Sequence, residues 1–164
     1  ERGYLFTQNV EPLYRFGNDQ TNWSDDAGRV TIKYSDFTTV IWKQDGEQYS
    51  RFILDGYSPT KDAEAHNFIT RDGYTDILNT STIVIIQGPL YNDEATTLPS
   101  VLTVGVGPLT IISNGKYIQG TWRRNDIADP FEFYDNDTNK IQVPPSKQWI
   151  HLLPIDGSVN ISEK

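Results

Sequence analysis

Residues 109–122 read Leu-Thr-Ile-Ile-Ser-Asn-Gly-Lys-Tyr-Ile-Gln-Gly-Thr-Trp, and this stretch decides the fold. Both halves are rich in β-branched and aromatic residues, which favour strands. Asn114 and Gly115 join the two halves, and this pair tolerates the positive φ angles of a two-residue type I′ turn. The stretch therefore predicts an antiparallel hairpin.

Further strand signals lie on both sides of this hairpin. Downstream, Phe131–Tyr134 and residues 140–143 flank an Asp/Asn-rich connector, and residues 148–153 form a last apolar segment. Upstream, residues 30–34 alternate apolar and polar side chains, and residues 39–43 face residues 48–54 across Asp45-Gly46. Such alternation is typical of strands with one buried face, and Asp-Gly is typical of hairpin turns.

Residues 82–87 (Thr-Ile-Val-Ile-Ile-Gln) predict a central strand covered on both faces, because four successive apolar residues leave no polar side. Residues 55–76 carry Gly, Pro and Asp, residues 90–100 carry Asn, Asp and Pro, and the two stretches predict two long loops. We therefore predict an all-β fold, an antiparallel sandwich or half-open barrel of roughly eight to ten short strands.

Composition limits the possible functions. The 164 residues suffice for one core. A formal net charge of −8 argues against a nucleic-acid partner, which would need clustered Lys and Arg. The absence of Cys excludes disulfides and cysteine-ligated zinc. No stretch approaches the roughly 18 apolar residues of a membrane span.

Several motifs of the C-terminal half resemble the C-terminal domain of YerB-type bacterial lipoproteins. They are Ser113-Asn114-Gly115-Lys116, Gly120-Thr121-Trp122-Arg123-Arg124, Phe133-Tyr134-Asp135 and Gln148-Trp149-Ile150. Asn114 stands where that family usually has Asp, and Asn139-Lys140 stands where it usually has Gly. The resemblance covers nearly the whole chain with lower specificity upstream. It implies a fold and a compartment, while the family's activity is undefined.

The resemblance also implies a domain organisation and a location. Residues 1–29 would be a lead-in from a missing N-terminal domain, and residues 30–164 a single β-rich C-terminal domain. The parent would be extracytoplasmic, held at the membrane only through a lipid anchor outside this chain. We expect a non-catalytic accessory or binding module whose partners are an envelope protein, a cell-wall component or its own N-terminal domain. The alternative is part of a cell-wall hydrolase or carbohydrate-active protein whose catalytic residues lie in that N-terminal domain.

Motifs for catalysis, cofactors and metals are weak. The two histidines, His66 and His151, have no nucleophile motif around them, and His151 takes a place on one face of a predicted strand. Residues 135–139 (Asp-Asn-Asp-Thr-Asn) imitate the opening of a calcium loop, but Lys140 replaces the required Gly and Ser146 the required Glu. We expect an Asx-rich turn there, and no cofactor or metal.

Two groups of residues are candidates for binding. The predicted loop 55–76 holds Tyr57, His66, Arg71 and Tyr74, a mixture of aromatic anchors and hydrogen-bonding groups that suits a polar ligand or a protein surface. The second group is Trp122, Arg123 and Arg124. These side chains form either a core Trp followed by cations paired with Asp126 or Asp129, or an aromatic platform beside a guanidinium that contacts carboxylate or phosphate.

Overall fold

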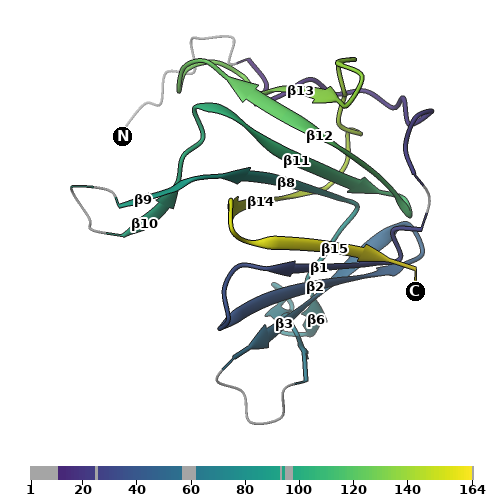
Figure 1. Ribbon diagram of the computed structural model, residues 1–164. Helices are drawn as coiled ribbons and strands as arrows, with labels where there is room; N and C mark the ends of the chain where they lie inside the picture. Colours follow the sequence, from purple (N-terminus) through teal and green to yellow (C-terminus); the bar gives the residue numbers. More distant parts are fainter. Residues whose placement is uncertain (1–10, 25, 57–61, 93, 95–97, 164) are drawn as a thin grey trace, which may run out of the picture.

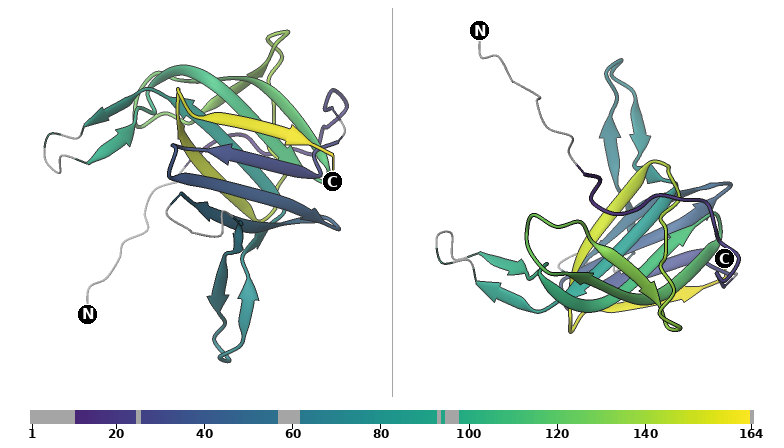
Figure 2. Two further views of the ribbon diagram at one scale, coloured as in Figure 1. Left: turned by 60° about the horizontal axis from the view of Figure 1, so that its bottom comes forward. Right: turned by 90° about the horizontal axis from the view of Figure 1, so that it is seen from above.

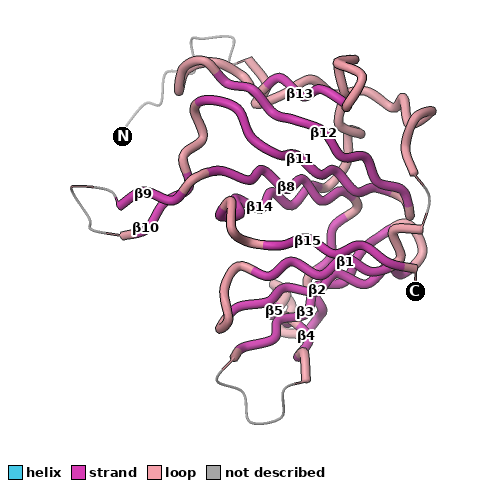
Figure 3. The backbone as a smooth tube through the Cα atoms, viewed as in Figure 1, coloured by secondary structure: helices cyan, strands magenta, loops and turns pink. Residues whose placement is uncertain are grey.

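The Asn114-Gly115 turn joins two nine-residue strands, β11 (Gly105–Ser113) and β12 (Lys116–Arg124), in the computed structural model. Both turn residues have positive φ, 52° and 75°, so the predicted hairpin is confirmed. The structure describes residues 11–24, 26–56, 62–92, 94 and 98–163. These residues form strands, turns and loops without a helix, which confirms the all-β class (Figure 3).

The hairpin lies in a five-stranded sheet of order β13-β12-β11-β8-β14 (Figure 1). Its other members are β8 (Thr82–Gly88), β13 (Glu132–Asp135) and β14 (Gln148–Pro154). Strand β8 lies between β11 and β14 with residues 82–86 fully buried, as the apolar run predicts. The β14–β8 pairing is parallel, because the chain crosses the sheet between β13 and β14 and enters β14 from the same end as β8.

The second sheet follows the order β15-β1-β2-β3-β4, with β7 also paired to β3. Its strands are β1 (Arg29–Lys33), β2 (Thr38–Asp45), β3 (Gln48–Asp55), β4 (Glu64–Ala65), β7 (Asn79–Thr80) and β15 (Ser158–Ser162). The predicted β2–β3 hairpin is confirmed, with Gly46 at φ 60° in its loop.

One core lies between the two sheets. It is built by Ala27, which precedes β1, and by the inward residues of both sheets, namely Val30, Ile32, Val40, Trp42, Tyr49, Ile83, Ile85, Ile112 and Leu153. Because strand side chains alternate, residues 84 and 86 of β8 point to the opposite face. That outer face of the five-stranded sheet needs a second cover.

The cover is a layer made of residues 11–24 and of the irregular segments on either side of β13, residues 128–131 and 136–144. They bury a second core of Tyr14, Trp23, Val84, Ile86, Leu109, Ile111, Ile118, Trp122, Phe131, Phe133, Ile141 and Val143. Residues 140–143, expected to form a strand beside Phe131–Tyr134, form no regular strand and pair with β13 through an isolated Tyr134–Lys140 bridge. Val143 instead forms a parallel bridge with Phe16. Segment 11–24 is thus an integral part of the fold, and Trp23 packs onto the sheet.

Two hairpin arms extend from the sandwich where the sequence suggested loops (Figure 2). One is β5 (Asn67–Ile69) with β6 (Thr75–Ile77), and the other is β9 (Leu90–Asn92) with β10 (Pro99–Val101). The loop prediction was wrong for these stretches because exposed three-residue strands bury too little apolar surface to show a periodic pattern. No helix of the length and apolarity needed to cross a bilayer occurs among the described residues.

Candidate functional site

The first group of predicted binding residues is dispersed. Tyr57 lies outside the described residues. Arg71 and Tyr74 are exposed near the tip of the β5–β6 arm, where 75% of Tyr74 is accessible. His66 lies at the root of this arm, with its Nδ1 hydrogen-bonded to Nη1 of Arg51 and its backbone N–H donated to the Arg51 carbonyl at 2.9 Å. His66 therefore fastens the arm to β3.

The second group has one buried and two accessible members. Trp122 is 1% exposed, and its Nε1–H donates to the Gln87 carbonyl at 2.8 Å, so its ring belongs to the core. Arg124 donates from Nε to the Asp129 carbonyl at 2.7 Å and lies 4.7 Å from the Phe131 ring centroid. Arg123 is exposed opposite Glu132 on β13.

The two groups lie on different sides of the molecule. The β5–β6 arm extends from the six-stranded sheet, whereas β12 belongs to the five-stranded sheet beside its edge strand β13 (Figures 1 and 2). The views agree that the arm and the end of β12 are far apart. A single ligand of side-chain size cannot contact both groups.

His151 is a structural residue in the core between the sheets. It is 2% exposed, the Trp42 Nε1–H donates to its Nε2 at 2.8 Å, and its Nδ1 lies 2.6 Å from the Tyr34 hydroxyl. Since an indole nitrogen only donates, Nε2 must be the acceptor and Nδ1 carries the proton. Burial, and secondarily the charge of Arg51, lowers the pKa of His151 from 6.5 to about 3. The ring is therefore held neutral.

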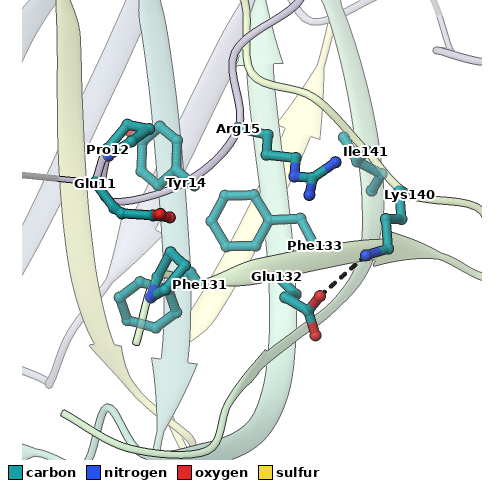
Figure 4. A pocket seen from close by; sticks show the side chains of 10 residues that line it. Glu11, Pro12, Tyr14, Arg15, Phe131, Glu132, Phe133, Lys140 and Ile141 are labelled. Carbon is teal, nitrogen blue, oxygen red and sulfur yellow. Dashed lines mark hydrogen bonds and ion pairs between the residues drawn. The ribbon is translucent and has the colours of Figure 1, made fainter. Parts of the chain in front are cut away.

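A pocket of about 110 Å³ opens in the outer layer (Figure 4). We call it the aromatic pocket. Its lining consists of Glu11, Pro12, Tyr14, Arg15, Pro130, Phe131, Glu132, Phe133, Lys140 and Ile141. The apolar walls are aromatic and proline rings at the place where segment 11–15 meets β13 and the segments flanking it. Backbone hydrogen bonds from Phe131 to the Leu13 carbonyl, 2.7 Å, and from Val143 to the Arg15 carbonyl, 3.0 Å, hold the two sides together.

The aromatic floor is rigid. The Tyr14 and Phe133 ring centroids are 5.2 Å apart, and those of Phe131 and Phe133 are 6.1 Å apart. The Tyr14 hydroxyl donates to Oε1 of Gln148 at 2.6 Å, and burial raises the pKa of Tyr14 to about 12. Phe131 also packs edge-on against Trp122 at 5.6 Å. The pocket is thus preformed by side chains that are fixed in the core.

Charged groups surround this apolar floor. Lys140 Nζ lies 3.0 Å from Oε1 of Glu132, and hydrogen bonds from Lys140 and Tyr134 lower the pKa of Glu132. Arg15 and Glu11 are exposed and have no ion-pair partner in the described part of the chain. Figure 4 shows the Arg15 guanidinium on the Lys140 side of the mouth and the Glu11 carboxylate on the opposite side, beyond Phe133.

Within the described ranges, no three His, Asp or Glu side chains are grouped to hold a metal ion. The Asp135–Asn139 stretch is the expected Asx turn. Oδ1 of Asp135 accepts the backbone N–H groups of Asp137 and Asn139 at 2.9 and 2.8 Å. The Asn139 side chain also donates to this carboxylate. Its hydrogen bond is the main cause that lowers the pKa of Asp135, and the two backbone hydrogen bonds lower the pKa further.

Sequence reasoning did not find the aromatic pocket. Phe131 and Phe133 were read only as strand residues, and the lead-in carries no periodic pattern that would predict contact with β13. The available signal was the concentration of aromatic residues in an apparently irregular N-terminal segment. Large aromatic side chains contribute much apolar area to a core, so their concentration in one segment indicates that the segment packs onto a surface.

Comparisons with known proteins agree with the fold. No curated protein matches this chain. The crystal structure of the YerB protein from Bacillus subtilis is similar, with a TM-score of 0.56 and 14% sequence identity. The match covers 84% of this chain and 45% of that chain, so this chain corresponds to only about half of the YerB structure. Identity at this level shows a shared fold.

The family comparison is more specific. Residues 29–150 match the C-terminal domain of DUF3048, a protein of unknown function, and this confirms the resemblance drawn from the hairpin and strand motifs. The chain therefore belongs to the DUF3048 family, as a member of its C-terminal domain.

Proposed function

We propose that this domain is a non-catalytic peptide-binding module of a bacterial cell-envelope lipoprotein, and that the aromatic pocket receives one apolar side chain of its partner. The observation that carries the proposal is the preformed aromatic floor within a charged rim. Interface hot spots have this arrangement, in which a desolvated aromatic centre is surrounded by polar groups.

The size of the pocket favours a side chain over a free cofactor. Sites for small molecules usually enclose roughly 300–1,000 Å³. The aromatic pocket, at about 110 Å³, is well below that range. An anchoring side chain needs less space, because the rest of the partner can lie across the rim and the adjoining surface.

The histidines support a role in binding over hydrolysis. A general base must be able to exchange a proton near the working pH. His151 is buried, engaged through both ring nitrogens and has a pKa near 3. His66 is bound to Arg51 at the root of an arm. The envelope location rests on the resemblance to YerB-type lipoproteins, with the lipid anchor outside this chain.

A peptide selection tests the binding role. The purified domain is immobilised and used to select peptides from a random displayed library, and the best peptide is titrated into ¹⁵N-labelled domain. We expect saturable shifts of the amides of Glu132, Lys140 and Ile141. Failure to select any peptide, or shifts confined to the β5–β6 arm, would overturn the proposal.

Variants and a cell-wall assay complete this test. Phe131→Leu shortens the floor while keeping an apolar residue, and we expect it to weaken binding at least tenfold. Tyr74→Ala removes an exposed aromatic residue elsewhere and should leave affinity unchanged; thermal melting checks that both variants fold. Release of soluble fragments from purified peptidoglycan by the domain alone would show catalysis and contradict the proposal.

The proposed location has its own test. The complete parent protein, tagged at its C-terminus, is produced in bacteria, and intact cells are treated with protease. Loss of the tag from intact cells is the expected result, whereas protection until lysis would contradict an extracytoplasmic location.

A further inference from the structure

Both cations and carboxylates lie around the aromatic pocket of this acidic protein. The chain has 14 Lys and Arg residues against 22 Asp and Glu residues. Four of these cations lie at or beside the pocket, namely Arg15, Arg123, Arg124 and Lys140. The pocket lining also holds two carboxylates, Glu11 and Glu132, so its charges balance and the position of each charge decides what the mouth can bind.

Two of the four cations are already engaged. Arg124 is fixed by the carbonyls of Ile127 and Asp129 and lies over Phe131. Lys140 binds Glu132. The nearby charge of Arg123 also contributes to lowering the pKa of Glu132, so that single carboxylate already serves two cations. The two positive charges of Lys140 and Arg123 together exceed the single negative charge of Glu132.

Of the two cations that line the pocket, Arg15 is the one without an ion-pair partner among the described residues. It lines the pocket, is exposed, and forms no ion pair with any residue that the structure describes. Its backbone is fixed, because its carbonyl accepts the Val143 N–H at 3.0 Å. In Figure 4 the guanidinium lies above the edge of the Phe133 ring, on the side of Lys140. Guanidinium groups bind carboxylates through two parallel N–H donors.

Resting on the proposed function, we propose that the partner is an acidic peptide in which a carboxylate stands next to the aliphatic side chain that enters the pocket. The side chain packs on Tyr14, Phe131 and Phe133, and the carboxylate meets Arg15 at the mouth. The carboxylate of Glu11, on the other side, disfavours a second acidic group there and so sets the direction of the peptide. The carboxylate can be that of an Asp or Glu side chain or that of the peptide C-terminus.

Three tetrapeptides with blocked ends show whether binding depends on the negative charge next to the anchoring side chain. Acetyl-Gly-Leu-Asp-Gly-amide, its Asn counterpart and its Lys counterpart are titrated against the domain by NMR at low salt. We expect the Asp peptide to bind at least tenfold more tightly than the Asn peptide, with the Lys peptide weakest. This preference should shrink in 500 mM NaCl, since salt screens exposed charges.

A fourth peptide distinguishes the two sources of carboxylate. Acetyl-Gly-Gly-Leu with a free C-terminus carries its only carboxylate on the anchoring residue, and it is compared with its C-terminal amide. Tighter binding of the acid than of the Asp peptide assigns the site to a chain terminus, and the reverse order assigns it to an internal acidic residue.

Arg15→Gln tests the assigned cation. It should reduce the Asp-to-Asn affinity ratio to about one, and Arg15→Glu should make the Lys peptide the preferred ligand. Arg71→Gln removes the same charge from the β5–β6 arm and should keep the Asp preference.

The outcomes separate this inference from the proposed function. Equal binding of the Asp and Asn peptides, or an Asp preference that survives in Arg15→Gln, overturns the inference and leaves peptide binding intact. Tighter binding of the Lys peptide by the unaltered domain also overturns it. If none of the peptides binds and the random library also selects none, both are overturned.

Discussion

His151 should make the stability of the domain depend on pH well above the range in which carboxylates titrate. Its pKa falls from 6.5 in the unfolded chain to about 3 in the folded domain, because burial and then the charge of Arg51 disfavour the imidazolium. Between these values the unfolded state binds a proton that the folded state does not. Stability is therefore complete above pH 6.5 and is lost as the pH falls toward 3.

The magnitude follows from linkage. Each pH unit within this window costs about 1.4 kcal/mol for one proton. Between pH 7.5 and pH 5.0 the free energy of unfolding should fall by about 2 kcal/mol from this residue, since only the part below 6.5 contributes fully. Ordinary unfolded carboxylates titrate near pH 4, so their contribution enters mainly below this interval.

Urea unfolding followed by tryptophan fluorescence measures this effect. A His66→Gln background removes the other imidazole, and the free energy of unfolding is compared at pH 7.5 and 5.0 with and without His151→Gln. The glutamine can still accept from Trp42 and donate to Tyr34, so we expect a folded variant that has lost the pH dependence. If that variant fails to fold, the Nδ1-protonated tautomer in the His66→Gln parent is checked by ¹⁵N NMR. The reasoning would be refuted if the free energy of unfolding of the His66→Gln parent were the same at pH 7.5 and 5.0. It would also be refuted if the His151 imidazole were protonated at Nε2.

Three further substitutions test the packing around the central hairpin. Gly107→Ala should destabilise the domain by several kcal/mol, roughly the scale of severe overpacking, because the new Cβ would lie 2.3 Å from the Gln87 carbonyl oxygen. Urea unfolding measures this loss, and a loss below about 1 kcal/mol would contradict the prediction. Trp122→Phe should cost about 2 kcal/mol, since the Gln87 carbonyl loses its indole donor; an unchanged midpoint would disprove that role. Asn114→Ala should cost about 1 kcal/mol because φ is 52°, whereas Asn114→Gly should be nearly neutral, and equal effects would exclude backbone strain.

Local chemistry in the sequence predicted the hairpin and the buried strand of the central sheet. It predicted neither the parallel pairing of β14 with β8, where antiparallel pairing was expected, nor the outer cover. The hairpin at Asn114-Gly115 and the buried strand β8 carry signals within a few residues, namely turn propensity and an unbroken apolar run. The outer layer depends on contact between residues more than 100 positions apart, such as Phe16 with Val143. A single sequence holds no local pattern for such a contact.

The candidate site was missed for the same reason. The predicted binding residues were chosen from exposed or irregular stretches, and Arg123 and Arg124 do lie beside the aromatic pocket on β12. The group that shapes the pocket, Tyr14 with Phe131 and Phe133, is separated by more than 100 residues and is assembled only by folding. Trp122 was expected either in the core or as an aromatic platform; it lies in the core and supports the pocket from beneath by packing on Phe131.

The central claim is that the aromatic pocket receives a partner side chain, and intermolecular nuclear Overhauser effects test it most directly. The tightest peptide from the library selection is bound to the domain, and contacts from its aliphatic methyl groups are recorded. We predict contacts to the ring protons of Tyr14, Phe131 and Phe133. Methyl contacts to Phe68 and Tyr74 of the β5–β6 arm, with none to the pocket rings, would contradict the account.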